Sequence, residues 1–155
     1  MCQRLYIASR TKLTPTSKRK DAPYLGVRPL EGAREVFRQA FPAAECPYLY
    51  AAEAFAPCGC GFPEALEGRE RRKVEPEALL TMRRLVEVLR PAVKSRPRVR
   101  LLLSFLGDDD EPTSEGRTIG LNDLERPGFA FQHHEILTLL KEPQNNPLKL
   151  TKRNG

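Results

Sequence analysis

The stretch Arg98–Leu106, RVRLLLSFL, decides the fold. It is a compact apolar run that follows a basic segment and stops abruptly at Gly107 and a series of acidic residues. Its three consecutive leucines break the alternation of apolar and polar residues that a strand with one exposed face shows, and such continuous runs are typical of strands covered on both sides. The sequence therefore predicts a central strand buried on both faces.

An amphipathic helix is predicted just before this strand. Pro76 suits the first turn of a helix, where its missing N–H costs no hydrogen bond. From Leu79 to Leu89, apolar residues recur at spacings of three and four, with charged residues between them. Pro91 is expected to kink or end the helix.

The remaining elements are predicted from shorter patterns. Runs rich in apolar and aromatic residues favour strands, and apolar residues at helical spacing favour a short helix. A segment with two prolines and three glycines is predicted to be a loop. The expected strands cover residues 3–9, 24–30, 47–55 and 129–141, the short helix 31–41, and the loop 111–128.

These elements predict one globular domain over residues 1–155, of the α+β class. The expected architecture is a mixed four- or five-stranded sheet covered by one main amphipathic helix and a shorter helix. A mobile basic loop is expected near residues 11–22, and a frayed C-terminal tail from about residue 144. A chain of 155 residues buries enough apolar surface to fold without disulfides or a structural metal.

Composition excludes several classes of protein. No apolar run approaches the roughly 18 residues that a membrane span requires, and the N-terminus lacks the pattern of a secretory signal. We therefore expect a soluble, cytoplasmic protein without a membrane partner. The GxSxG, GxxxxGK[ST], GxGxxG and HExxH motifs are missing, so the sequence favours none of those enzyme classes and leaves open whether the protein is an enzyme.

The segment Ala56–Phe62, APCGCGF, is the best functional candidate in the chain. It sets Cys58 and Cys60 one residue apart between glycines. Two thiolates at this spacing bind soft or borderline ions such as copper(I) or zinc, although zinc sites more often use C-x₂₋₄-C and need further ligands. The other soft or imidazole ligands in the chain are Cys2, Cys46, His133 and His134. A metal site, a redox-active thiol pair and a structural turn with two buried thiols all remain open.

The two histidines are adjacent within a predicted strand. In a strand, neighbouring side chains point to opposite faces, so His133 and His134 are expected on different sides of the sheet. His133 would share its face with Glu135, which makes it the better candidate for a site. Its other neighbours on that face, Phe129 and Phe131, equally fit a histidine that only packs in the core.

Two stretches resemble a known group of proteins. MCQRLYIAS at the N-terminus and CGCGF in mid-chain are similar to an uncharacterised group of small bacterial proteins that open with Met-Cys and an apolar strand and carry a CGCGF box. The resemblance implies no reaction, but it implies that Cys2, Cys58 and Cys60 belong together. The resulting hypothesis is a soft-metal site, with zinc as candidate ion, formed by Cys58, Cys60, Cys2 and His133.

The charge of the chain supports a different function. The formal net charge is +6, and basic clusters occur near residues 10–20, 69–73, 94–100 and 149–153. Such clusters favour a binding protein that contacts a polyanion, nucleic acid or an acidic partner. Aromatic residues are few and no known nucleic-acid-binding motif is present. This alternative, and that of a thiol redox protein, stand beside the metal-binding hypothesis.

Overall fold

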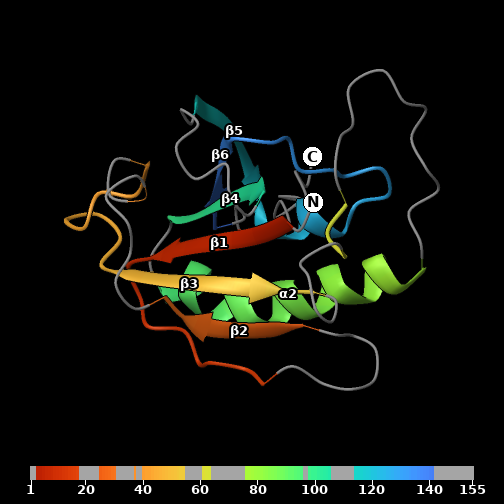
Figure 1. Cartoon of the computed structure of the whole chain (residues 1–155), viewed down its shortest axis with the longest axis horizontal. Coiled ribbons are helices and arrows are strands. Elements are labelled where there is room, and N and C mark those ends of the chain that lie inside the picture. The colour runs from red at the N-terminus through yellow and green to blue at the C-terminus, as the bar shows by residue number, and fades with distance from the viewer. Residues whose placement is uncertain are drawn as a thin grey trace, which may run out of the picture.

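A computed structural model of the chain describes residues 3–17, 25–30, 37, 40–54, 61–63, 76–95, 98–105 and 114–141. These residues form a sheet, a long α-helix and a short 3₁₀ helix, which confirms the α+β class (Figure 1). The elements are β1 (Gln3–Ser9), β2 (Gly26–Pro29), β3 (Tyr48–Glu53), α2 (Pro76–Ser95), β4 (Val99–Phe105), β5 (Ser114–Gly120), η1 (Leu121–Glu125) and β6 (Glu135–Leu140).

The sheet has six strands in the order β2-β3-β1-β4-β6-β5. Neighbouring strands are antiparallel except β5 and β6, which run parallel, so the sheet is mixed as predicted. The sheet has one strand more than the four or five expected, and the additional strand is the edge strand β5. That strand, SEGRTIG, lies inside the predicted loop 111–128 and carries little apolar periodicity, because an edge strand buries few of its side chains.

The predicted central strand is confirmed. β4 lies between β1 and β6, and both of its faces are buried. Leu101 and Leu103 belong to the core cluster under α2, on what we call the helix face of the sheet. Leu102 belongs to a second cluster on the opposite face. Consecutive leucines are therefore needed here, because each side of the strand faces protein rather than water.

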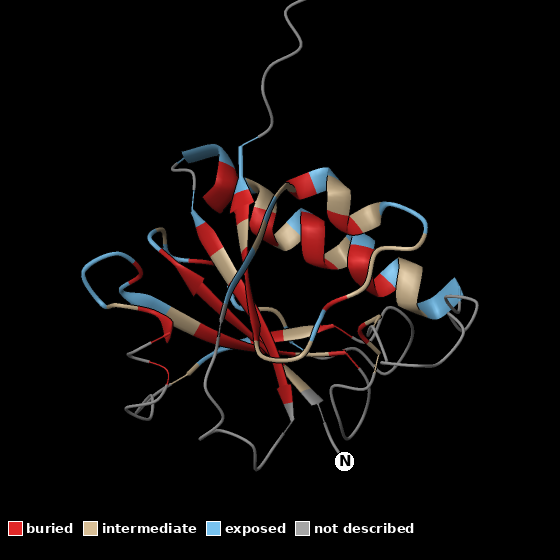
Figure 2. Cartoon of the chain, turned by 90° about the horizontal axis from the view of Figure 1, so that it is seen from above, coloured by how far each residue is buried: buried red, intermediate tan, exposed pale blue. Residues whose placement is uncertain are grey.

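The predicted helix is confirmed as α2, and the expectation that Pro91 ends it is wrong, whereas the alternative of a kink stays a prediction. The helix continues through Pro91 to Ser95. Its last turn is tied to the core by Ala92 and Val93, which are both buried, while Pro91 is exposed. Buried and exposed residues alternate along α2, as the colours of Figure 2 show. Packing of this turn offsets the lost backbone hydrogen bond. In the described part of the chain, no helix combines the length and the apolar character needed to cross a membrane.

The opposite face is covered by the segment that precedes β3. Phe37 stacks on Tyr6 of β1 with ring centroids 4.2 Å apart, and Phe41 is fully buried beside them. The Phe41 N–H donates to the Phe37 carbonyl, and Phe37 and Ala40 are helical. This agrees with the predicted short helix, whose other residues from 31 onward, apart from Phe41, lie outside the described residues.

Part of the predicted basic loop contacts the core. Leu13 is buried, and its N–H donates to the Tyr50 hydroxyl. Thr16 forms a backbone bridge with Val27 of β2. Residues 18–22 of the predicted loop, and the predicted tail from residue 144, lie outside the described residues.

Burial of the opposite face gives a direct test. Replacing Leu102 by alanine should lower the free energy of unfolding by about 2–5 kcal/mol, because it opens a cavity between β4 and the segment above it. Replacing Leu140, which is 40% exposed at the end of β6, by alanine should change the free energy of unfolding by less than about 0.5 kcal/mol. Urea unfolding of the two variants measures the difference, and equal losses would contradict the two-sided sheet.

Candidate metal centre at one end of the sheet

The segments that carry the candidate ligands attach to the same end of the sheet. At this end, which we call the thiol end, β1 begins while β3 and β4 finish. Gln3 pairs with Phe105, and Leu5 pairs with Ala52, so Ala54 lies level with the start of β1. Cys2 precedes Gln3 directly in the chain but lies outside the described residues.

The exit of the CGCGF box is fixed at the thiol end. Cys58 and Cys60 lie outside the described residues, but Gly61 packs so closely on Ala54 that a Cβ atom at Gly61 would lie 2.9 Å from the Ala54 Cβ atom. Phe62 is buried in the main core. The described residues on either side of the segment 55–60, Ala54 and Gly61, are therefore in contact, and Cys60 directly precedes Gly61 in the chain.

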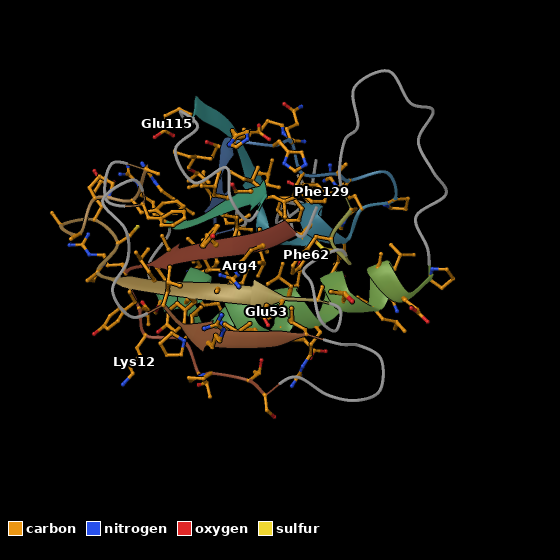
Figure 3. The ribbon with its side chains drawn as sticks, viewed as in Figure 1. Arg4, Lys12, Glu53, Phe62, Glu115 and Phe129 are labelled. Atoms are coloured by element: carbon orange, nitrogen blue, oxygen red, sulfur yellow. The ribbon has the colours of Figure 1, made fainter. Side chains whose placement is uncertain are left out.

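The histidine segment is tied to the same exit. The Phe131 N–H donates to the Pro63 carbonyl over 2.8 Å, and the Phe131 ring meets the Phe62 ring edge-on with centroids 6.2 Å apart. Two residues further on, His133 forms a backbone bridge with Leu103 of β4. Figure 3 shows Phe62 and Phe129 at the end of the sheet where β1 begins, and Lys12 at the other end.

The predicted strand over residues 129–141 is wrong in its first half. β6 starts only at Glu135, because His134 adopts a left-handed backbone with φ of 57° that interrupts any strand. The two imidazole rings have centroids 6.1 Å apart. The expectation that His133 and His134 lie on opposite faces of one strand therefore fails, and both side chains are half-buried at the turn into β6.

The expected partnership of His133 with Glu135 is replaced by an ion pair that the sequence did not reveal. The Arg117 guanidinium binds the Glu135 carboxylate through Nε and Nη2, the latter at 2.8 Å, and the Arg117 backbone N–H donates to the same carboxylate at 2.9 Å. Burial alone would raise the pKa of the Glu135 carboxyl, but these hydrogen bonds outweigh burial and hold the pKa below its usual value.

This ion pair positions the histidine segment. Arg117 Nη2 also donates to the Ala130 carbonyl at 2.9 Å, and the guanidinium lies over the Phe129 ring. Gly116 leaves the room that the Glu135 side chain occupies, because any side chain there would overlap it. Arg117 thereby joins the edge strand β5 to the residues just before His133, which fixes the approach of that segment to the sheet.

A second polar group lies on the opposite face at the thiol end. Arg4 of β1 and Arg28 of β2 both contact the Glu53 carboxylate, at 3.4 Å and 3.2 Å. Buried Ser104 stands level with Arg4 on β4. Sequence reasoning missed this group because its members are far apart in the chain, and only the strand register brings them together.

Cys46 does not belong to the thiol end. It precedes β3, whereas the CGCGF box follows β3, and a six-residue strand separates its ends by about 17 Å. Cys46 is buried among Tyr6 and Phe41. Burial raises the pKa of its thiol, although Arg100 opposes the effect. Its place at the other end of β3 separates this thiol from the thiol end.

Within the described residues, no group of three histidine, cysteine, aspartate or glutamate side chains is placed to hold a metal ion. Of the predicted ligands, only His133 falls in that part of the chain. The structure brings His133, the exit of the CGCGF box and the start of β1 to one end of the sheet. A metal centre there depends on the cysteines that these segments carry.

The Arg117–Glu135 pair gives a pH-dependent prediction. Replacing Glu135 by glutamine should lower the free energy of unfolding at pH 7 by about 1–3 kcal/mol, because charged hydrogen bonds to a buried group are lost. Since the pKa of Glu135 is lowered in the folded state, its contribution is present above the usual carboxyl pKa and disappears as the pH falls through the folded value. The difference between wild type and variant should therefore shrink on acidification.

Urea unfolding at a series of pH values measures this difference. Glu115, an exposed carboxylate that pairs with Arg100 at 3.2 Å, is the matched control. Its glutamine variant should cost less than about 1 kcal/mol at pH 7, as exposed ion pairs do. A loss at Glu135 no larger than at Glu115, or one independent of pH, would contradict the role given to the buried pair.

Comparison with known proteins assigns this chain to no family. No protein-family model, curated protein or solved structure matches it. The likeness of its N-terminal strand and CGCGF box to small bacterial proteins therefore stays a prediction from those two stretches. A function for the chain has to be inferred from the geometry of its two sheet ends.

Proposed function

We propose that this protein binds a soft metal ion, with zinc as the first candidate, at the thiol end of its sheet. Cys58 and Cys60 are the proposed primary ligands, and Cys2 and His133 complete the set. The hydrogen bond from the Phe131 N–H to the Pro63 carbonyl carries the proposal. It ties the exit of the CGCGF box to the segment that holds His133, although more than 60 residues separate the two in the chain.

The reach of the chain supports the inclusion of Cys2. Consecutive Cα atoms are about 3.8 Å apart, so Cys2 and Cys60 are each one such step from a described residue, Gln3 and Gly61. Gln3 begins β1, and Ala54, on which Gly61 packs, lies level with it across the β1–β3 pair. The two thiols therefore attach to adjacent points of the sheet.

The chemistry of this end suits thiolate ligands. A cysteine binds metal as the thiolate, which nearby cations favour. Arg4 lies two residues from Cys2 and carries one of two guanidinium groups at this end of the opposite face. Three thiolates and one imidazole make a Cys₃His set, which is typical of tetrahedral zinc sites that leave no open position for a substrate. The proposed site would therefore hold an ion whose four coordination positions are all occupied by protein ligands.

Metal content tests the proposal. Untagged protein should contain about one zinc ion per chain when prepared with zinc, as four-coordinate structural sites do. The double variant Cys58→Ser/Cys60→Ser should lose it, whereas Cys46→Ala should keep it, because Cys46 lies at the other end of β3. Elemental analysis together with a thiol count before and after denaturation provides the measurement.

Each outcome decides between the open functions. Stoichiometric metal, with thiols shielded until denaturation, supports a metal site. Folded protein that takes up no zinc overturns the proposal. If such metal-free protein forms a reversible bond between Cys58 and Cys60 on mild oxidation, thiol redox chemistry replaces metal binding as the function.

The contact of Gly61 with Ala54 provides a test that removes no ligand. Gly61→Ala should weaken zinc binding by about tenfold or more, since a misplaced support of the ligand shell has effects of this size. The added methyl would lie 2.9 Å from the Ala54 Cβ atom and push the exit of the box away from the sheet.

Moving the methyl group supplies the control. In the double variant Ala54→Gly/Gly61→Ala, the space vacated at residue 54 accepts the new methyl, and zinc affinity should recover. Competition with a chromophoric chelator measures both constants. Equal affinities for wild type and Gly61→Ala would show that this contact does not position the ligands.

A further inference from the structure

The end of the sheet opposite the thiol end is basic. Here β1 finishes, β4 begins and β6 finishes: Ser9 pairs with Val99, and Val99 pairs with Leu139. Arg10 directly follows Ser9 and Arg98 directly precedes Val99, so both arginines lie at this end of two neighbouring strands. The exposed cations at this end, which we call the basic end, are Arg10, Lys12, Lys94, Arg98 and Lys141.

Two of these cations reach the basic end through α2 and the segment after β1. The Thr11 hydroxyl is hydrogen-bonded to the Ser95 hydroxyl at 2.9 Å. Lys12 and Lys94 adjoin these two residues, so the last turn of α2 and the segment after β1 bring their cations to one corner. Lys141 follows Leu140 at the end of β6, two residues past the partner of Val99.

These five side chains make no ion pair within the described residues, unlike most of the other arginines that the structure describes. Elsewhere arginines are bound to carboxylates, at Glu53, Glu87, Glu115, Asp123 and Glu135. Glu45, which precedes β3, contacts Arg100 at 3.5 Å and none of these five cations. Apart from Arg83 and Arg90 on α2, the latter hydrogen-bonded to Asn122, the cations without an ion pair in the described part of the chain therefore gather at one end.

An exposed aromatic ring lies beside these cations. Tyr48 begins β3, pairs with Ser9 next to Arg10, and is 40% exposed. It lies on the same face as Tyr50, whose hydroxyl accepts a hydrogen bond from the Leu13 N–H. Tyr48 is thus on the side of the sheet that residues 11–13 cross. No other aromatic ring in the described residues is exposed to this degree.

We infer that the basic end binds single-stranded nucleic acid. Unpaired lysines and arginines bind phosphates and release counterions, and an exposed aromatic ring beside them stacks a base. An acidic protein would use the cations and leave Tyr48 without a role, so the ring favours nucleic acid as the partner. This site is independent of the proposed metal site, from which the length of the sheet separates it.

Fluorescence anisotropy with labelled single-stranded oligonucleotides, measured on the full chain over a range of salt concentrations, tests the inference. If all five cations contact phosphates, the slope of log K against log salt should be about −3.5, since each phosphate contact contributes about −0.7. In Arg10→Gln/Arg98→Gln the slope should become shallower by about 1.4. Arg83→Gln/Arg84→Gln removes the same charge from the outer face of α2 and should leave the slope unchanged.

The tyrosine separates nucleic acid from other polyanions. Tyr48→Ala should lower affinity for the oligonucleotide by about fivefold to a hundredfold without changing the salt slope, and Tyr48→Phe should retain it, because stacking needs only the ring. Circular dichroism confirms that each variant is folded. Equal effects of the two arginine pairs, an unchanged affinity in Tyr48→Ala, or equally tight binding of polyglutamate would each overturn the inference.

Discussion

The pairing of β1 with β4, and the burial of both faces of that pair, is the constraint on which the rest of the structure depends. Seven residues of each strand are in register, from Gln3 with Phe105 to Ser9 with Val99. Leu5 and Leu103 form part of the core under α2, and Leu102 the core on the other side. A shift of the register by one residue would move the side chains of each face to the other face. The side chains that pack under α2 would then lie against the segment around Phe41.

This register also creates the two ends that carry the proposed functions. Antiparallel strands place the start of β1 beside the finish of β3 and β4, and the finish of β1 beside the starts of those strands. Cys2 and the CGCGF box therefore attach at one end, and Arg10 and Arg98 at the other. Segments that are far apart in the sequence are brought to the same end of the sheet because one strand pair fixes their positions.

The strongest patterns predicted the fold correctly, and the weakest did not. The leucines of β4 and the periodicity of α2 reflect which side chains are buried. Such patterns are visible in the local sequence, and tertiary packing agrees with them. β5 buries little and was predicted to be a loop, while the turn at His134 depends on Arg117 and Glu135, which meet only after β5 and β6 pair. For the site, CGCGF was visible in the sequence, but the Pro63–Phe131 contact and the Arg4–Glu53 pair follow from register, which no local pattern encodes.

The order of strands in the sheet has a consequence for how the chain folds. β1 is made first, but its partner Val99 is about 90 residues downstream of Ser9. Synthesis at about 5–20 residues per second delays that pairing by several seconds on the ribosome, and such long-range contacts make folding slow. During this interval the apolar strand at the N-terminus has at most β3 as a neighbour in the sheet. Its open edge is a point at which a chaperone would bind or aggregation begin.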